Sequence, residues 1–381
     1  MQNNDFFEEL EQHSLIKIKL LQEYLIKWIR KITLGLQQNC LICDTFAGEG
    51  LYNDGTEGSP ICILNECIKY FNQPNIKKYD VYVLFVEQDK KHYESLKKNI
   101  KAKYNIDIKD DEFSNCEAFP MLHVGTINKT HESFINEFCL TRQLPPSLFF
   151  IDPFGFKDSQ FSSLVKLMNK KEPIEFVINF MYEEFNRFKS LDEVNEPLSL
   201  FFGSDVRALN KEVSLFSPKK RRHYIINQYR NNLENSGIKH TLNFDIQKDN
   251  SSAYKMSLVF ASNNISGFNV MKETMLDLCK DVSFEYKTKE KKEPTLFTYC
   301  EKDFLNHSLA TLLYSELKES DQLTKEDIKR YLECHPIIPS GYLSKLLKIM
   351  GENGRIYIHD SKGNINRSPK KFSDNTIIYF N

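Results

Sequence analysis

The sequence lacks the features that mark membrane, secreted and strongly charged proteins. Its longest apolar runs have the length of strands, short of the ~18 residues that span a membrane, and no N-terminal segment resembles a signal peptide. The nine cysteines are an odd number without a regular framework, which predicts reduced, mostly buried thiols in a cytoplasmic protein. Because the net charge is only -1, any affinity for nucleic acid must come from local basic patches.

The cysteine spacing of a zinc site is also missing. Cys40 and Cys43 form a CxxC pair, but no second pair at a similar spacing follows it. Cys43 also lies in an apolar run that predicts a strand, where a buried thiol is the ordinary outcome. We therefore expect no metal site.

The residues that are present indicate two globular domains. The chain has 381 residues, of which 41% are hydrophobic and 27% are charged, as in a soluble protein with a packed core. The charge run from Lys287 to Lys292 is the best candidate for a linker. We predict a first domain over residues 1–286 with a polar, basic, helical insertion at about 181–240, a linker over 287–302, and a second domain over 303–381.

Patterns of strands and helices alternate along the first domain. A lead-in helix is expected over residues 13–30, and a helix over 59–71 with Ser59 as its cap and Pro60 in its first turn. Near-continuous apolar runs predict the buried strands of a parallel sheet with helices on both faces, a Rossmann-like α/β fold. The predicted strands are Cys40–Asp44, Asp80–Val86, Met121–Thr126, Ser147–Ile151, Glu175–Phe180 and, closing the sheet, Tyr254–Ala261.

The last domain has a different pattern. Apolar residues at helical spacing come first, and residues that alternate in polarity follow them near the C-terminus. The expected elements are helices at 305–317, 325–333 and 342–352, the second capped by Thr324, and strands at 355–359 and 376–380. Because three helices followed by a hairpin are the winged-helix pattern, we predict a winged-helix-like C-terminal domain.

The turn after the first predicted strand has the sequence Asp44-Thr45-Phe46-Ala47-Gly48-Glu49-Gly50. Ligands of parallel sheets bind at the carboxyl ends of the strands, and glycines let the backbone approach them. The turn has neither the GxGxxG of a dinucleotide fold nor the Lys of a P-loop, which argues against a nucleoside triphosphate. The alternative is an ordinary glycine turn.

Two further strands end at an acid. Glu87 would accept hydrogen bonds from the ribose hydroxyls of a nucleoside, or else it caps the next helix from the surface, a role that Asp89 can also fill. The segment Asp152-Pro153-Phe154-Gly155-Phe156 follows the strand at 147–151. Its carboxylate and a neighbouring carbonyl can accept hydrogen bonds from an exocyclic amine, and Phe154 or Phe156 can stack on a flipped base. A plain Asp-Pro turn is the alternative.

Taken in order, these segments resemble the three-Cys-motif partner (TcmP-like) proteins, a methyltransferase-like family, over roughly residues 10–280. The blocks that carry the resemblance are His13-Ser14-Leu15-Ile16-Lys17 with Leu21, Tyr24 and Leu25, then Asp44 to Gly50, Gly58-Ser59-Pro60, Phe85-Val86-Glu87 and Ile151-Asp152-Pro153-Phe154-Gly155. This chain has Glu49 where the family usually has Pro. The resemblance implies a Rossmann-like fold, S-adenosylmethionine as cofactor, and a partner protein with three clustered cysteines that resembles radical S-adenosylmethionine enzymes.

The resemblance also implies roles for individual residues. Lys17 would contact the carboxylate of the cofactor, and Asp44 would order the turn or meet the cofactor ammonium. Phe46, Gly48 and Gly50 would shape the cofactor cleft, and Glu87 would hold the ribose. The expected catalytic residues are Asp152, which would orient the acceptor amine, with Pro153 and Phe154 beside it.

A looser similarity to the amino-methyltransferases of DNA and RNA suggests the substrate. Their motif is Asp/Asn-Pro-Pro-aromatic, whereas Phe154 here replaces the second Pro and Gly155 the aromatic residue. We predict a methyltransferase that acts on a base amine of DNA or RNA. The basic surfaces that would bind the nucleic acid are Lys219-Lys220-Arg221-Arg222 and, in the C-terminal domain, Lys362, Arg367, Lys370 and Lys371.

Other functions remain open. The main alternative is a catalytically degenerate methyltransferase fold that regulates or assists a radical-enzyme-like or defence-system protein. The departures at Phe154 and Gly155 favour this alternative, whereas the acids Asp44, Glu87 and Asp152 favour retained cofactor binding. A nuclease ranks last, because no PD…ExK pattern of acids with lysine lies near the predicted strand ends.

Overall fold

The computed structural model describes residues 12–52, 54–74, 76, 79–248, 253–279, 282–287, 301–359, 365–366 and 372–381. The chain divides into two compact units, Met1–Phe268 and Asn269–Asn381. The predicted domain boundaries stay a prediction, and residues 288–300 of the predicted linker lie outside the described residues.

The first unit is built on a sheet whose central strands are parallel. From one edge, its strands follow the order β3-β4-β2-β1-β5-β6-β8-β7. Neighbours from β4 to β6 pair in parallel, whereas β3 and the hairpin of β7 and β8 are antiparallel. The mixed α/β, Rossmann-like fold class is thus confirmed. The strands are β1 Cys40–Asp44, β2 Val81–Val86, β3 Phe113–Cys116, β4 Phe119–Ile127, β5 Ser147–Ile151, β6 Ile174–Phe180, β7 His240–Gln247 and β8 Tyr254–Ser262.

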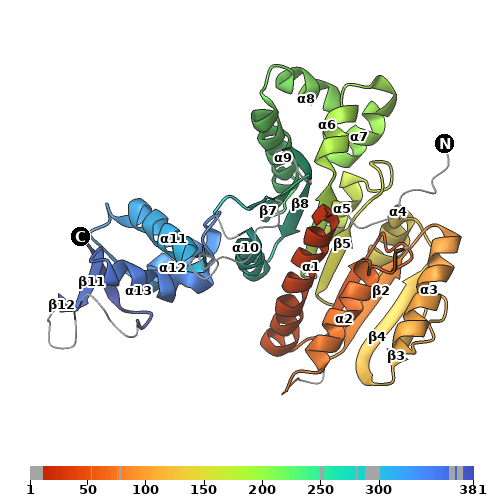
Figure 1. Cartoon of the computed structure of the whole chain (residues 1–381), viewed down its shortest axis with the longest axis horizontal. Coiled ribbons are helices and arrows are strands. Elements are labelled where there is room, and N and C mark those ends of the chain that lie inside the picture. Colours follow the sequence, from red (N-terminus) through yellow and green to blue (C-terminus); the bar gives the residue numbers. More distant parts are fainter. Residues whose placement is uncertain are drawn as a thin grey trace. The chain divides into compact units, whose positions relative to one another are not determined.

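Helices cover both faces of the sheet (Figure 1). One face carries α1 (Gln12–Arg30), which continues as a π-helical turn over Lys31–Leu36, together with α2 (Ser59–Phe71) and α3 (Lys90–Tyr104). The other face carries α4 (His131–Phe134) with its π-helical continuation Ile135–Cys139, and α5 (Phe161–Met168). This two-layer cover explains why the central strands are apolar on both sides.

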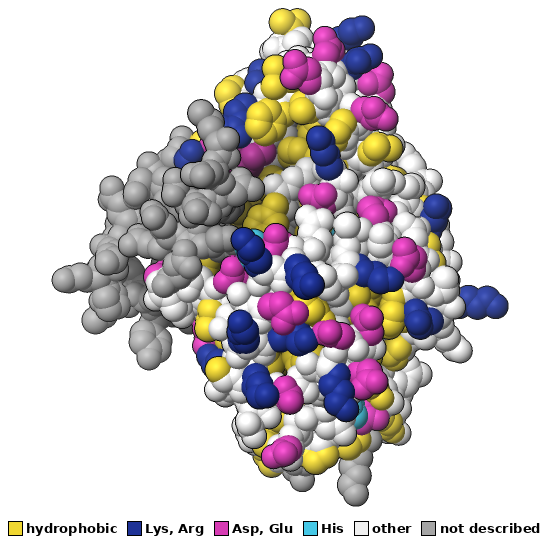
Figure 2. Space-filling view, turned by 90° about the vertical axis from the view of Figure 1, so that its right-hand side faces the viewer, with side chains coloured by type: hydrophobic (Ala, Val, Ile, Leu, Met, Phe, Trp, Pro, Cys, Tyr) yellow, Lys and Arg dark blue, Asp and Glu magenta, His cyan; other side chains and the backbone are white. Residues whose placement is uncertain are grey.

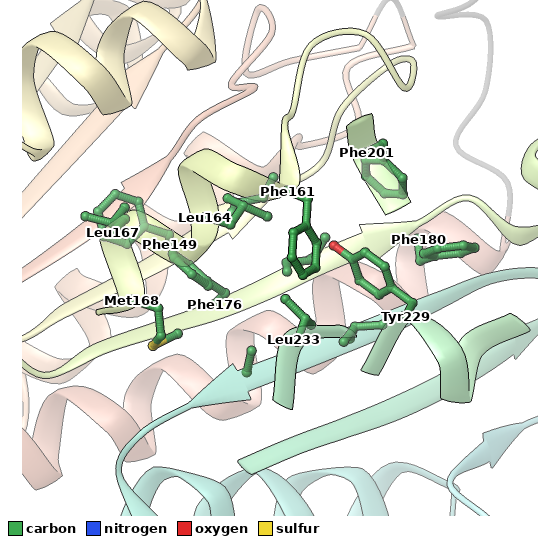
Figure 3. Packing of buried hydrophobic residues seen from close by; sticks show 14 of the residues in the cluster. Phe149, Phe161, Leu164, Leu167, Met168, Phe176, Phe180, Phe201, Tyr229 and Leu233 are labelled. Carbon is green, nitrogen blue, oxygen red and sulfur yellow. The ribbon is translucent and has the colours of Figure 1, made fainter. Parts of the chain in front are cut away.

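An apolar core lies between the sheet and the α4–α5 layer. Alternate strand residues such as Leu41, Cys43 and Phe149 point into it and are buried. The rings of Phe180 and Phe201 lie 5.1 and 5.6 Å from the ring of Tyr229 in an aromatic cluster, shown in Figure 3. Burying an aromatic ring of this size contributes about 2 kcal/mol, so the cluster anchors the helices that follow β6.

The segment predicted as a helical insertion contributes to this core. It contains α6 (Tyr182–Phe188), a 3-10 turn at Asp192–Val194, α7 (Asn195–Phe202), α8 (Val206–Val213) and α9 (Pro218–Asn235). The patterns in the sequence do not predict β7, which follows α9. One face of β7 is polar, with Thr241, Asn243 and Asp245, because arginines of α9 bond to that face.

The second unit contains helices and a small antiparallel sheet of order β10-β13-β11-β12. The helix α10 (Ile265–Cys279) begins in the first unit and ends in the second. Its Lys272 is fully buried and donates hydrogen bonds to the carbonyls of Leu332, His335 and Ile338 over 3.2, 2.7 and 3.1 Å. The remaining elements are β9 Glu285–Tyr286, α11 Glu301–Leu317, β10 Gln322–Thr324, α12 Lys325–Cys334, a 3-10 turn Ser340–Tyr342, α13 Leu343–Glu352, β11 Ile356–His359, β12 Ile365–Asn366 and β13 Ile377–Phe380.

Candidate functional site

Three acids follow the carboxyl ends of neighbouring strands. Asp44, the last residue of β1, lies in register with Phe85 of β2 on one side and Phe150 of β5 on the other. Glu87 directly follows β2, and Asp152 directly follows β5. The structure therefore brings Asp44, Glu87 and Asp152 to one edge of the sheet, where ligands of such folds bind.

Asp44 is fully buried below the turn that follows β1. Its carboxylate accepts a hydrogen bond of 2.6 Å from the Ser59 hydroxyl and one of 3.2 Å from the Phe46 backbone N–H. Burial, with a smaller contribution from the nearby carboxylate of Asp152, raises the pKa of Asp44 to about 7, and the two hydrogen bonds oppose this shift. Asp44 thus ties the turn to the start of α2.

The hydrogen bond between Ser59 and Asp44 corrects the prediction of how α2 is capped. Ser59 was predicted to cap α2, but Gly58 is the N-cap and Ser59 is the first helical residue. The Ser59 hydroxyl instead donates to Asp44. Gly58 also donates its N–H to the Gly50 carbonyl over 2.8 Å, and a Cβ at Gly58 would lie 3.1 Å from that oxygen.

The two glycines of the turn are required for different reasons. Both have positive φ, +61° at Gly48 and +78° at Gly50, which other residues rarely adopt. A Cβ on Gly50 would lie 2.9 Å from Leu96 Cδ1, whereas a Cβ on Gly48 would meet nothing within 4 Å. The backbone at Gly48 therefore faces open space, and the turn at Gly50 is packed against α3.

Glu87 is buried and fixes the same turn from β2. One carboxylate oxygen accepts the Gly48 N–H over 2.8 Å, and the other accepts the Asp89 N–H over 2.7 Å. Burial raises the pKa of Glu87, and these backbone bonds oppose that shift. Asp89, not Glu87, caps α3, because its side chain accepts from the N–H groups of Lys91 and His92. Each Glu87 oxygen still has capacity for a further donor.

Asp152 is held by two side chains from other elements. Lys17 of α1 forms an ion pair with one of its carboxylate oxygens, and Asn179 of β6 donates to the other over 2.7 Å. The sequence patterns did not single out Asn179, although an amide near the end of an otherwise apolar strand was a signal for it. The Asn179 Oδ1 is buried and has no hydrogen-bond partner among the described residues.

The aromatic candidates differ in exposure. Phe154 is 56% exposed, whereas Phe156 packs edge-on against Phe185 and Phe201, with ring centres 5.8 and 5.2 Å away. Phe154 is therefore the more accessible of the two rings that were predicted to stack on a base, because Phe156 is half-buried against the aromatic core. Pro153, between Asp152 and Phe154, is buried.

Two further residues at this edge were not predicted. His131 is 2% exposed, stacks on Phe46 with ring centres 5.1 Å apart, and has no hydrogen bond to a described residue on either ring nitrogen. Burial lowers its pKa to about 3, so the ring is neutral at physiological pH. Burial, with the charges of Asp152 and Asp44, raises the pKa of Tyr52 to about 12. The spacing of Phe46 and His131 in the sequence does not indicate that their rings stack.

The predicted basic patch of α9 is partly buried. Arg222 is 2% exposed, lies 3.6 Å from Asp245 and stacks on the ring of Tyr254, while Arg221 donates to the carbonyls of Val213 and Phe216. Only Lys219 and Lys220 of the four remain exposed, so a four-residue basic surface here is wrong. On the face drawn in Figure 2, the described acidic and basic side chains are mixed. Lys362, Arg367, Lys370 and Lys371 lie outside the described residues.

A groove of about 950 Å³ lies at the other end of the strands. Its lining comes from the segments that precede β1, β5 and β6, including Asn39, Pro146 and Pro173. None of the three acids lines it. Because polar groups and glycine turns converge at the carboxyl ends instead, we place the candidate site there.

Three further observations, on metal binding, membrane-spanning helices and cysteines, apply to the described residues alone. Among these residues, no group of three or more His, Cys, Asp or Glu side chains is placed to hold a metal ion. No helix in this part of the chain is long and apolar enough to cross a membrane. The cysteines in the described ranges are free thiols, and those of β1 are buried.

Comparison with known proteins assigns this chain to no family. No family model matches the chain, and no curated protein matches it. Among solved structures it is similar to a Legionella pneumophila protein of the DUF519 family model, at 12% identity over 70% of this chain and 92% of that chain, with a TM-score of 0.38. It is also similar to the O-methyltransferase TomG from Streptomyces achromogenes, solved with S-adenosylmethionine, at 10% identity over 67% and 92%, with a TM-score of 0.29.

A third similar structure is a spermidine synthase bound to a transition-state analogue, at 11% identity over 77% of this chain and 75% of that chain, with a TM-score of 0.33. The fold class of this chain follows from its own strand order and pairing.

Proposed function

We propose that this chain is an S-adenosylmethionine-dependent methyltransferase that acts on a base amine of DNA or RNA. The observation that carries the proposal is that Asp44, Glu87 and Asp152 lie at the same end of neighbouring strands, where Asp44 and Glu87 hold the glycine turn. Glu87 and Asp152 offer hydrogen-bond acceptors, and Lys17 beside Asp152 offers a cation, which together fit a nucleoside that carries both an ammonium and a carboxylate group.

The residues at this edge fit the parts of the cofactor. The open space at Gly48 leaves room for a ligand against the backbone, and Glu87 has acceptor capacity left for ribose hydroxyls. Lys17 would pair with the cofactor carboxylate, and Asp44, with Phe46 and Gly50, would keep the turn in shape. When bound, S-adenosylmethionine supplies an electrophilic methyl group.

The acceptor would lie on the side of Asp152. Methyl transfer to an amine requires the nitrogen to be held in line with the methyl group, away from water. Because Lys17 and Asn179 fix both oxygens of Asp152, its remaining acceptor positions have defined directions for the N–H groups of an amine. Phe154, which is exposed, would stack on the base, with buried Pro153 holding the turn.

One observation favours the catalytically degenerate alternative. Both carboxylate oxygens of Asp152 already have a partner in the protein, so an amine substrate would add to an occupied group. On this alternative the chain still binds the cofactor, and it assists or regulates a radical-enzyme-like or defence-system protein.

The remaining expectations belong to the same proposal. These are membership of the TcmP-like family with its three-Cys-motif partner protein, a cytoplasmic location, and a winged-helix-like C-terminal unit that binds nucleic acid. The order α11, α12, α13 and then β11 and β13 supports the last of these.

Calorimetry with S-adenosylmethionine tests the cofactor. We expect binding by the full chain that Glu87→Ala weakens about tenfold, since it removes the ribose acceptor. Glu112→Ala, which removes an exposed acid just before β3, serves as the matched control and should bind normally. Absence of binding by the unaltered chain would reject the cofactor.

Transfer of a tritiated methyl group to mixed cellular DNA and RNA tests the reaction. Label in one nucleic acid, lost in Asp152→Ala, supports methyl transfer. Cofactor binding without label in either nucleic acid would favour the degenerate alternative.

A further inference from the structure

The sheet of the second unit has an apolar face on each side. Ile356, Ile358 and Ile378 are buried on one face. By the alternation of strand residues and by the register of β11, β12 and β13, Tyr357, Tyr379 and their neighbours lie on the other face. The outer face of a one-sided sheet is ordinarily polar, so an aromatic outer face needs a physical reason.

Three aromatic side chains on this outer face form one cluster. Tyr357 and Tyr379 are directly opposite in register, and their rings stack with centres 5.1 Å apart and planes 12° apart. The ring of His359, two residues along β11, meets the rings of Tyr357 and Tyr379 edge-on at 5.7 and 5.0 Å. We call Tyr357, His359 and Tyr379 the aromatic platform.

Exposed isoleucines extend the aromatic platform on both sides. Ile377, on β13, is 43% exposed, and Ile365, which pairs with His359, is 58% exposed. His359 itself is exposed, and the two tyrosines are half-buried. A cross-strand aromatic pair alone would stabilise the hairpin, but it would not call for two exposed isoleucines beside it. A continuous exposed apolar strip of this kind marks a surface that binds a partner.

The charge of the C-terminal segment indicates what kind of partner the aromatic platform would bind. Although the whole chain has a net charge of -1, residues 341–381 contain seven lysines and arginines against three acids. Lys345 and Lys348, in the described part of this segment, are exposed on α13. This excess of lysine and arginine in the C-terminal segment favours a polyanion as the partner over a second copy of the chain.

We propose that the aromatic platform binds single-stranded nucleic acid by stacking its bases on the rings of Tyr357, His359 and Tyr379. Aromatic rings beside cations are the combination that holds single strands, and the bases of a duplex are not open to such stacking. This inference deepens the nucleic-acid part of the proposed function and rests on it for the partner. It does not require methyl transfer, because strand binding can be measured without cofactor.

Fluorescence anisotropy of the full chain with labelled oligo(dT) and oligo(U) tests the platform. We expect binding that Tyr357→Leu combined with Tyr379→Leu weakens about tenfold, since leucine keeps the apolar cover but cannot stack. Tyr357→Phe with Tyr379→Phe should bind as the unaltered chain does. The matched control is Tyr331→Leu, which removes a 42%-exposed tyrosine from α12 of the same unit and should leave affinity unchanged.

An abasic strand of the same length separates stacking from charge. It keeps the phosphates, so we expect weaker binding that the double leucine variant does not change further. Equal affinity of the unaltered chain for abasic and intact strands, or no binding to either, overturns the proposal.

Two measurements distinguish base stacking from a loss of folding and from self-association. If the double leucine variant melts earlier, His359→Ala tests the same platform, because this exposed ring lies at the end of β11 and its removal leaves the tyrosine pair in place; we expect severalfold weaker binding. Light scattering that shows a dimer of the unaltered chain, lost in the leucine variant, would assign the face to self-association and overturn the proposal.

Discussion

Lys17 and Asp152 form an ion pair although 135 residues separate them in the chain. Two helical turns after Lys17, Tyr24 of α1 donates a hydrogen bond to Glu175 at the start of β6. Asp152 lies beyond the carboxyl end of β5, and Glu175 lies at the amino end of β6. The helix α1 therefore runs along the strands and connects the candidate site at their carboxyl ends to their amino ends.

Replacing Lys17 tests its role at the cofactor. In Lys17→Met the ion pair is lost and no cation remains for the cofactor carboxylate, so we expect about tenfold weaker binding of S-adenosylmethionine by calorimetry. Lys19→Met, at an exposed position of the same helix, should bind normally. Unchanged affinity in Lys17→Met would limit Lys17 to positioning Asp152.

Burial of Asp44 predicts a loss of stability as pH rises. Its ordinary pKa is 3.8 and its pKa in the fold is about 7, so between these values the folded state holds a proton that the unfolded state has lost. The folded state therefore loses stability from about pH 4 to 7, by at most about 1.4 kcal/mol per pH unit. Asp44→Asn should remove this contribution.

Denaturant unfolding at pH 5 and pH 8 measures the effect. We expect Asp44→Asn to gain stability relative to the unaltered chain on going from pH 5 to pH 8. The exposed Asp107→Asn is the matched control. An equal difference at both pH values for Asp44→Asn would contradict the assigned shift.

Burial of His131 predicts the opposite pH dependence, a loss of stability as pH falls. Its ordinary pKa is 6.5 and burial lowers it to about 3, so below pH 6.5 the unfolded state takes up a proton that the folded state does not. Stability is therefore lost as pH falls from about 6.5 toward 3. His131→Phe keeps the stack on Phe46 and removes two buried nitrogens that no described residue bonds, so its advantage over the unaltered chain should grow from pH 7.5 to pH 5. Thermal melts at the two pH values measure this, and a constant difference would show that the ring is not held neutral.

A side chain added at Gly267, outside the candidate site, would clash with its neighbours. A Cβ there would lie 2.1 Å from Glu175 Oε1, and Glu175 is itself 3% exposed and bonded to Tyr24. We expect Gly267→Ala to lower the free energy of unfolding by about 2–3 kcal/mol, because the buried carboxyl group cannot move aside freely. Gly35→Ala, whose nearest neighbour would be 4.0 Å away, should cost nothing measurable in the same denaturant series. Equal stability of the two variants would show that α10 can shift away from β6.

The central sheet was predictable because its strands are buried on both faces. Cys40–Asp44 and Ser147–Ile151 appear in the sequence as unbroken apolar runs, and their predicted bounds agree with those of β1 and β5. The strand β7 differs from these runs because Leu242, Phe244 and Ile246 alternate in it with Thr241, Asn243 and Asp245. Near-continuous apolar runs identify only strands that are buried by apolar residues on both faces, whereas an alternating pattern such as that of β7 is the separate signal for a strand with one polar face.

The gathering of Asp44, Glu87 and Asp152 at one end of the strands was predictable, but the bonds that they make were not. An acid at each strand end can be inferred from sequence, since parallel strands end at the same edge. That Lys17 pairs with Asp152, or that Ser59 bonds to Asp44 and leaves the cap to Gly58, depends on distances that only the packed chain sets. The run Lys219–Arg222 likewise looks basic in sequence, while the fold buries Arg222.

The hydrogen bonds of Lys272 decide how the C-terminal unit can be removed. Cutting the chain before residue 303 would take away all three carbonyls that accept hydrogen bonds from Lys272, in the middle of α10, and would uncover the part of α10 on which these residues pack. Such a fragment would be expected to misfold locally or aggregate, whatever the unit does in the cell. Point changes on an intact chain are therefore the sounder way to separate the two halves.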